Sequence, residues 1–285
     1  MEGDARSPTV RRRELGALLR AMRTEAGMTV EQVAEALLVS SSKVSRLETG
    51  HRGASARDIR DLSGLYGVTD PALRKHLDTL AREGRGQAWW QPYDLPYATY
   101  VGLEAEAATI SDFESGVIPG LLQTPDYARA VHEANMPRLS PAVIEQRIEV
   151  RRTRQTILTR DDEPPQLRAI ADEAVLHRVV GGPAVMADQL DHVIQECDRP
   201  NVTVQVIPYA AGAHPALDST FILLEFAPPV SGVVYVDGLV GQVYLERLQD
   251  VERYTQIFER LLTFSLGEQA SIDLMAKLSA AYKKD

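Results

Sequence analysis

The sequence has almost no cysteine, since Cys197 is the only one among 285 residues. A single thiol cannot form a disulfide within the chain, and a lone cysteine is more often an inert core residue than a nucleophile. The six histidines have neither the H-x-x-x-H spacing nor the cysteine-rich context of a metal site. We therefore expect no bound metal ion and no cofactor.

Long apolar runs are also missing. No segment approaches the roughly 18 consecutive apolar residues of a membrane span. The N-terminus contains Arg11, Arg12 and Arg13 without the apolar stretch that a signal peptide needs. We expect a cytoplasmic protein with no membrane contact.

Catalytic motifs are absent as well. The sequence contains no G-x-x-x-x-G-K-[ST] loop and no G-x-S-x-G elbow. Glu104 and Glu106 are two positions apart on a predicted helix, so they point in different directions. Asp172 and Glu173, at the end of a predicted strand, could hold a base, but acidic residues in such places are usually solvated. The chain is therefore not expected to be an enzyme.

The negative charge is distributed unevenly along the chain. The net charge is −9, but residues 1–80 contain 13 basic and 11 acidic side chains, whereas the remainder contains 18 basic and 29 acidic ones. The first segment therefore carries +2 and the rest −11. Binding to phosphates requires only a local basic face, so the N-terminal part is the candidate for DNA contact.

Three short helices are predicted near the N-terminus. The first carries apolar residues at i, i+3, i+4 and i+7 and ends near Gly27. The second begins after Thr29, which stands three positions before Gln32 as in a capping box. The third runs over 41–48, with Ser40 as its cap. Two short helices joined by a tight turn make a helix-turn-helix.

The third helix has a polar and basic exposed face. Val44 and Leu47 must face the core, which directs the serines and Arg46 outward. Short hydroxyls allow close approach to a major groove, and arginine can bond guanine through two hydrogen bonds. The residues expected to contact double-stranded DNA are Ser41, Ser42, Lys43, Ser45, Arg46, Thr29, His51 and Arg52.

Residues 14–77 resemble the phage-repressor-like (XRE-type) helix-turn-helix family. The resemblance lies in Leu19-Arg20, Arg23, Gly27-Met28-Thr29, Val33-Ala34, Val44 to Glu48 and Gly50. It implies an ion pair between Arg23 on the first helix and Glu48 at the end of the recognition helix. Two positions depart from the family pattern. Val30 replaces a frequent phosphate-bonding glutamine, and Leu38, in place of a frequent turn glycine, requires either a strained left-handed residue or a different turn.

Two further helices complete a domain predicted to span residues 1–83. Ser55 with Asp58 caps one of them, and Asp70-Pro71 begins the other. Residues 84–88 are small and polar enough to be a linker. The second domain is then expected over 89–285.

The second domain contains two candidate binding segments. Aromatic residues just after the linker could line a ligand pocket or an interface, or could simply anchor a core. The run PGLLQT over 119–124 predicts a tight turn. The ligand or partner candidates are Trp89, Trp90, Tyr93, Tyr100, Leu121 and Gln123.

A basic stripe lies on a helix predicted to start at Ser140-Pro141. Arg147, Arg151 and Arg154 follow one another at i, i+4 and i+7. The stripe could bind phosphate, or it could be solvated or paired with acidic groups of its own domain.

Strand patterns appear from residue 166 onward. Strands are predicted over 167–171, 202–207, 221–226 and 233–236, with helices over 183–197 and 248–266. The fold class expected is α+β: a five-helix helix-turn-helix domain followed by a larger mixed α/β domain with a small sheet.

Residues 89–275 resemble an uncharacterised domain fused to such helix-turn-helix modules in actinobacterial, Streptomyces-type developmental regulators. The motifs are Trp89-Trp90, YVGLEAEA at 100–107, PGLLQT, Asp172-Glu173-Ala174, QVIP at 205–208, and Phe221 with Leu224-Glu225-Phe226. The resemblance implies a transcriptional regulator, often encoded beside a small acidic partner protein. A small-molecule sensor and a docking platform for protein both remain open for this domain, and the alternative is the regulator half of a toxin-antitoxin-like pair.

A homodimer held chiefly by the C-terminal part is also expected. One short recognition helix contacts only a few base pairs, so two copies about 34 Å apart on an inverted repeat are the economical geometry. The alternative is a weak monomer that dimerises only on DNA. In either case the protein would associate with the nucleoid.

Overall fold

The computed structural model describes residues 7–136, 138–228, 230–238 and 241–284. It contains two compact units. The first unit comprises residues 1–106 with 227–231, and the second comprises 107–226 with 232–285. Each is described by itself below.

The first unit contains the helix-turn-helix. Its helices begin where the sequence places capping residues: the side chains of Thr29, Ser40, Ser55 and Asp70 each accept a backbone N–H of the helix that follows. Thr29 with Gln32 and Ser55 with Asp58 both form complete capping boxes. The five helices are α1 (Pro8–Glu25), α2 (Val30–Ala36), α3 (Ser41–Glu48), α4 (Ala56–Leu65) and α5 (Pro71–Glu83).

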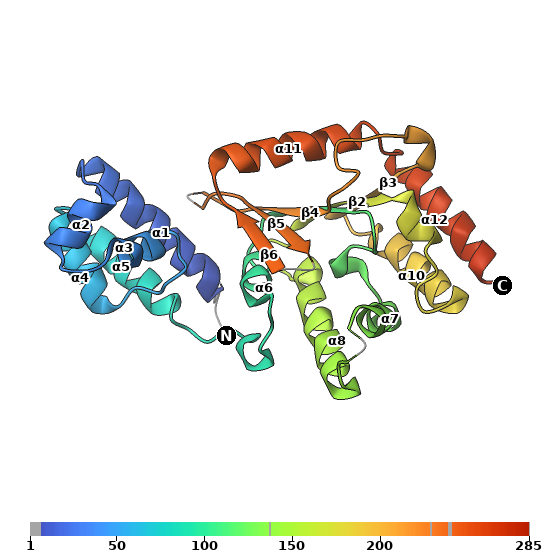
Figure 1. Ribbon diagram of the computed structural model, residues 1–285, viewed down its shortest axis with the longest axis horizontal. Coiled ribbons are helices and arrows are strands. Elements are labelled where there is room, and N and C mark those ends of the chain that lie inside the picture. The colour runs from blue at the N-terminus through green and yellow to red at the C-terminus, as the bar shows by residue number, and fades with distance from the viewer. Residues whose placement is uncertain (1–6, 137, 229, 239–240, 285) are drawn as a thin grey trace. The chain divides into compact units, whose positions relative to one another are not determined.

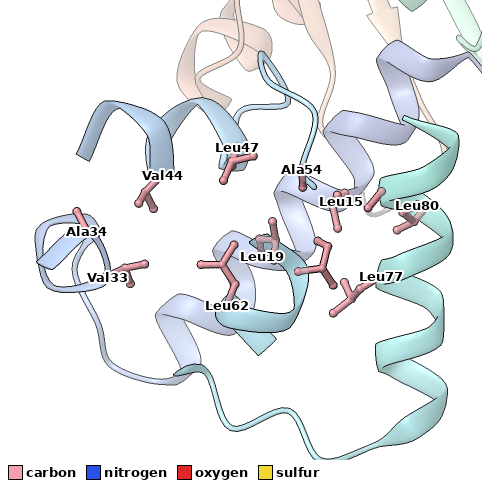
Figure 2. Packing of buried hydrophobic residues seen from close by; sticks show 12 residues of the cluster. Leu15, Leu19, Val33, Ala34, Val44, Leu47, Ala54, Leu62, Leu77 and Leu80 are labelled. Carbon is pink, nitrogen blue, oxygen red and sulfur yellow. The ribbon is translucent and has the colours of Figure 1, made fainter. Parts of the chain in front are cut away.

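One apolar core joins these five helices. Figure 2 shows side chains from all five helices directed toward a common centre, with Leu19 of α1 and Leu62 of α4 near its middle. Leu77 and Leu80 of α5 close one side and are fully buried. The apolar periodicity of the sequence therefore identified the buried face of each helix.

The first unit extends beyond the linker expected at 84–88. A 3₁₀ turn, η1 (Gln91–Tyr93), and helix α6 (Ala98–Glu104) belong to it. Gly102 of α6 approaches α1 so closely that a Cβ there would lie 2.4 Å from the Thr9 hydroxyl and 2.8 Å from the Trp90 ring. The aromatic segment is therefore part of the first unit, and α6 packs on the beginning of α1.

The second unit is built on a six-stranded mixed sheet in the order β3-β2-β1-β4-β5-β6. The strands β1, β2 and β3 are parallel, and β4, β5 and β6 continue the sheet in antiparallel pairs. Their bounds are β1 (Thr109–Glu114), β2 (Gln166–Asp172), β3 (Val202–Ile207), β4 (Phe221–Glu225), β5 (Val233–Gly238) and β6 (Gly241–Leu245). The expected α+β class, with a small mixed sheet, is confirmed.

Helices cover both faces of this sheet (Figure 1). On one face lie α7 (Pro125–Asn135), α8 (Pro141–Gln155) and α10 (Pro183–Glu196), which belong to the crossovers between the parallel strands. The long helix α11 (Leu248–Leu262) lies along the other face. The remaining elements are η2 (Gly120–Leu122), η3 (Thr156–Thr159), α9 (Glu173–His177), η4 (Tyr209–Ala211) and α12 (Glu268–Tyr282), which packs on α10 and β3.

The turn between α2 and α3 contains a strained residue. Leu38 has a φ of +54°, in the left-handed region that side chains with a Cβ rarely adopt. Its side chain is 92% exposed, so no burial offsets this strain. Of the two turn geometries compatible with leucine here, the structure has the left-handed one.

Replacing Leu38 with glycine is expected to stabilise the first unit. The free energy of unfolding should rise by about 0.5–1 kcal/mol, because relief of a left-handed penalty of about 1–2 kcal/mol exceeds the added flexibility of glycine in the unfolded chain. Both tryptophans of the chain lie in this unit, so urea unfolding followed by tryptophan fluorescence reports on it.

Ala36→Gly is the matched control. Ala36 is the last residue of α2, exposed and with helical geometry, so glycine there should destabilise the unit, by at most about 1 kcal/mol. Loss of stability in Leu38→Gly of the same size would show that the turn is not strained.

Candidate nucleic-acid interface

Helix α3 presents the surface that the helical spacing predicts. Val44 and Leu47 are buried in the core, whereas Ser42, Ser45 and Arg46 are exposed. Ser41 is half-buried at the beginning of the helix. The exposed surface is therefore small and polar, with one arginine at its centre.

Lys43 lies beside this surface but its charge is already paired. Its Nζ is 2.5 Å from Asp58 Oδ1, and the two side chains are 25% and 14% exposed. Burial would raise the pKa of Asp58, but hydrogen bonds from Lys43 and Ser55 hold that pKa below its usual value. Lys43 thus links α3 to the capping box of α4, which sequence reasoning did not foresee.

The segments flanking α3 provide the other predicted contacts. His51 and Arg52 are both exposed in the loop after α3. The Arg52 backbone N–H donates to the Arg46 carbonyl over 3.0 Å, and His51 Nδ1 lies 2.9 Å from the Thr49 hydroxyl. These contacts keep the loop close to the end of the helix. Thr29 is exposed at the beginning of α2, where its hydroxyl oxygen serves as the cap.

The ion pair implied by the family resemblance is present. Arg23 Nε donates to Glu48 Oε1 over 2.7 Å, and Nη2 donates to Oε2 over 3.0 Å. Arg23 Nη1 also donates to the Met28 carbonyl over 2.8 Å, so the guanidinium joins three segments. The Glu48 side chain is only 6% exposed. Hydrogen bonding to Glu48 raises the pKa of Arg23, despite the opposing effect of burial.

Tyr66, the residue that caps the C-terminal end of α4, interacts electrostatically with this ion pair. Burial and the Glu48 carboxylate together raise the pKa of Tyr66 to about 12. The phenol therefore stays neutral beside the ion pair at physiological pH.

A glycine on α1 allows α3 to approach. A Cβ at Gly16 would lie 2.5 Å from the Glu48 carbonyl oxygen and 2.7 Å from that of Leu47. Both neighbours are backbone atoms, which cannot move aside as a flexible side chain can. Helices α1 and α3 therefore cross in backbone contact, and the sequence pattern did not single out Gly16 for this role.

The other predicted binding candidates lie in both units, and most of them are buried. Trp90 and Tyr100 are 6% and 4% exposed in the first unit, and Trp89 packs edge-on against the Trp90 ring at 5.5 Å. Trp89 also lies edge-on to Tyr93, at 6.2 Å. Trp90 and Tyr100 are therefore core residues of the first unit, whereas Trp89 is 38% exposed and its binding role stays a prediction.

Leu121 and Gln123 lie in the second unit and are also buried. Gln123 donates to the Ile118 carbonyl over 2.6 Å and accepts a hydrogen bond from Arg151 of α8 over 2.6 Å. The PGLLQT segment is thus held by its own side chains. Arg151 and the 7%-exposed Arg154 of the basic stripe are directed into their own domain.

The acidic residues at the end of β2 have structural hydrogen bonds. Asp172 accepts the Ala174 N–H as the cap of α9, and its other oxygen lies 3.6 Å from His214 Nε2. Glu173 accepts the Tyr209 N–H over 2.6 Å. Among the described residues, no group of three histidine, cysteine or acidic side chains could hold a metal ion. Within the same part of the chain, no helix combines the length and apolarity that a membrane crossing requires.

Removing either member of the Arg23–Glu48 pair is expected to destabilise the first unit more than removing both. Arg23→Ala or Glu48→Ala leaves a buried charge without its partner, at a cost of about 3–5 kcal/mol, and the double variant removes that penalty. Urea unfolding by tryptophan fluorescence gives the double-mutant cycle. Additive losses would show that the two side chains do not stabilise each other.

Comparison with protein families identifies two regions. Residues 97–277 match a family described as "Domain of unknown function (DUF5753)". Residues 14–77 match a family described as "Helix-turn-helix domain". A search of the curated proteins found no match, and neither did a search of the solved structures.

Proposed function

Because the chain belongs to the DUF5753 family and has a helix-turn-helix domain before that region, we propose that it is a sequence-specific transcriptional regulator of the XRE type. In this proposal α3 enters the major groove of double-stranded DNA. The observation that carries it is the exposed face of α3, polar and basic, on a helix anchored to α1 through Glu48.

The exposed side chains have separate roles in the proposed complex. Arg46 hydrogen-bonds a guanine edge through its planar guanidinium, and Ser42 and Ser45 are short enough to let the helix backbone approach the bases. Arg52 and His51, in the loop after the helix, contact phosphates of the adjacent strand. Ser41 and Thr29, at the beginnings of α3 and α2, lie where helix N-termini favour phosphate.

Lys43 has a smaller role in this proposal than its position suggests. Its ammonium is paired with Asp58, so a contact to DNA would first have to break that ion pair. Arg46 is then the principal cation of α3 available to the bases. Loss of Lys43 should weaken the α3–α4 contact more than it changes sequence preference.

The charge distribution supports this division between the domains. The segment containing the helix-turn-helix carries +2 and the remainder −11, so phosphate repels the larger part of the chain and attracts only the smaller. The C-terminal domain would then act as the regulatory part and bind a ligand or a small partner protein. Such a regulator works on chromosomal DNA, and we expect it in the cytoplasm at the nucleoid.

Arg46→Ala is expected to lose sequence-specific binding while the domain stays folded. The loss should be about 1–3 kcal/mol for each base contact removed, since a bidentate arginine–guanine contact is worth that much discrimination. Selected-oligonucleotide binding identifies the operator, and fluorescence anisotropy at fixed salt measures affinity for it and for unrelated DNA.

Lys75→Ala is the charge-matched control for Arg46→Ala. Lys75 is exposed on α5 and is not among the predicted DNA contacts, and its loss removes the same single positive charge. It should change affinity for operator and unrelated DNA alike. An operator affinity for Arg46→Ala equal to that of Lys75→Ala would refute the role of Arg46.

We further propose that two copies act together as a homodimer joined mainly through the C-terminal domain. Helix α3 has only eight residues and reads a few base pairs, which rarely gives the roughly 10⁻⁸ M affinity of a working regulator. Two copies about one helical turn apart would read an inverted repeat. The acidic C-terminal domain would stand away from the phosphates, where it can join the protomers.

Light scattering of the full chain tests the dimer. Without DNA, at micromolar concentration, the expected mass is twice 31.4 kDa. A mass of 31.4 kDa without DNA, doubling only when an inverted-repeat duplex is added, would instead support a monomer that dimerises on its operator.

A further inference from the structure

The second unit has a groove on the sheet face along which α11 lies. Its volume is about 480 Å³, within the range of small-molecule sites. The floor is formed by the beginnings of the parallel strands β1, β2 and β3 and by the end of β4. Phe258 and Leu262 of α11 form an apolar wall, and the first residue of α12 closes the far side.

The character of this sheet face changes along the strands. Near their ends, Phe113, Ile170 and Ile207 pack with Phe258 and Leu261 in a buried core. At their beginnings the residues of the same face are polar instead, because side chains two positions apart on a strand share a face. A sheet face covered throughout by a helix would be apolar over its whole length. The polar side chains at the beginnings of the strands therefore form a surface beside the apolar core that α11 covers.

The floor offers hydroxyl and amide groups in adjacent rows. Thr109 is in register with Gln166 on one side and Glu225 on the other, and Arg168 is in register with Thr203. These rows place donors and acceptors at strand spacings of about 4.8 Å. The spacing is close to that of two equatorial hydroxyl groups on alternate carbons of a sugar ring.

The charges of the groove leave an excess of carboxylate. The guanidinium of Arg168 is compensated by Glu259, at 2.8 Å, and lies over the Phe258 ring, 5.1 Å from its centroid. Glu225 and Glu268 have no ion pair among the residues that the structure describes. Two carboxylates in a groove are therefore available to a cationic ligand.

The two carboxylates flank the groove on opposite sides. Glu225 lies on β4, whereas Glu268 begins α12, which packs on β3. Three strand spacings separate β4 from β3, or about 14 Å. A ligand that reaches both must be elongated, with roughly the length of two linked rings.

We propose that this groove binds an aminated, polyhydroxylated small molecule of the amino-sugar class. Its ammonium groups pair with Glu225 and Glu268, its hydroxyls bond the threonines and Gln166 of the floor, and one ring face packs against Leu262. The site lies wholly in the second unit and does not depend on the DNA-binding function proposed above. The C-terminal domain would then respond to a small molecule.

A matched pair of disaccharides tests the chemistry of the ligand. The β1,4-linked glucosamine disaccharide carries two amines, and its di-N-acetylated counterpart has the same rings without charge. Isothermal titration of the full chain should detect binding of the amine form and at least tenfold weaker binding of the acetylated form. Equal binding of the two sugars, or no binding of the amine form, would overturn the proposal.

Substitutions of the two groove carboxylates test whether the ligand binds in this groove. Glu225→Gln and Glu268→Gln should each weaken binding of the glucosamine disaccharide about tenfold, since each removes a charge-assisted hydrogen bond. Glu252→Gln is the matched control, because Glu252 is an exposed carboxylate of α11 that does not line the groove. Circular dichroism confirms that each variant is folded, and operator binding of each is measured in parallel. Binding that is unchanged in both groove variants, or reduced equally in Glu252→Gln, refutes the site whatever happens to DNA binding.

Discussion

The contact between α1 and α3 is the constraint on which the DNA-binding domain depends. A recognition helix reads bases only if its angle to the rest of the domain is fixed, and α3 is too short to fix its own position through its two core residues alone. The bidentate Arg23–Glu48 pair fixes the end of the helix, and Gly16 lets the two backbones meet. Taking these charges out of water is costly, so the pair contributes orientation more than net stability.

The two cations on α3 differ in whether an acidic side chain compensates their charge. Lys43 holds α4 through Asp58, whereas the Arg46 side chain is exposed and has no ion pair among the residues that the structure describes. Lys43 therefore maintains the geometry, and Arg46 is the cation to which we assign the base contact. In the second unit two arginines of the basic stripe, Arg151 and Arg154, are likewise directed inward, where Arg151 holds the Gln123 segment.

The two faces of the mixed sheet differ in how far helices cover them. The face under α7, α8 and α10 is closed by the crossovers of the parallel strands (Figure 1). The face along α11 is apolar only where that helix packs, and polar where the strands begin. A single helix laid along a sheet cannot cover all of it, and the uncovered end is where a groove with polar side chains forms.

The sequence by itself determined the helix-turn-helix, its caps, the buried face of each helix and the Arg23–Glu48 pair, because these follow from spacings of a few residues and from one family motif. Four of the strands and the helices α10 and α11 were also predicted, β3 with its exact bounds and the others with boundaries shifted by up to four residues. Strands β1 and β6 were not predicted; in β1, Ser111, Asp112 and Glu114 hide a central strand behind a polar sequence. Only the tertiary structure decided which residues far apart in the sequence come into contact. It paired Lys43 with Asp58, placed Gly102 against the beginning of α1, and gathered Thr109, Arg168 and Glu225 on one sheet face. Such contacts depend on strand order and helix crossing, which local periodicity does not encode.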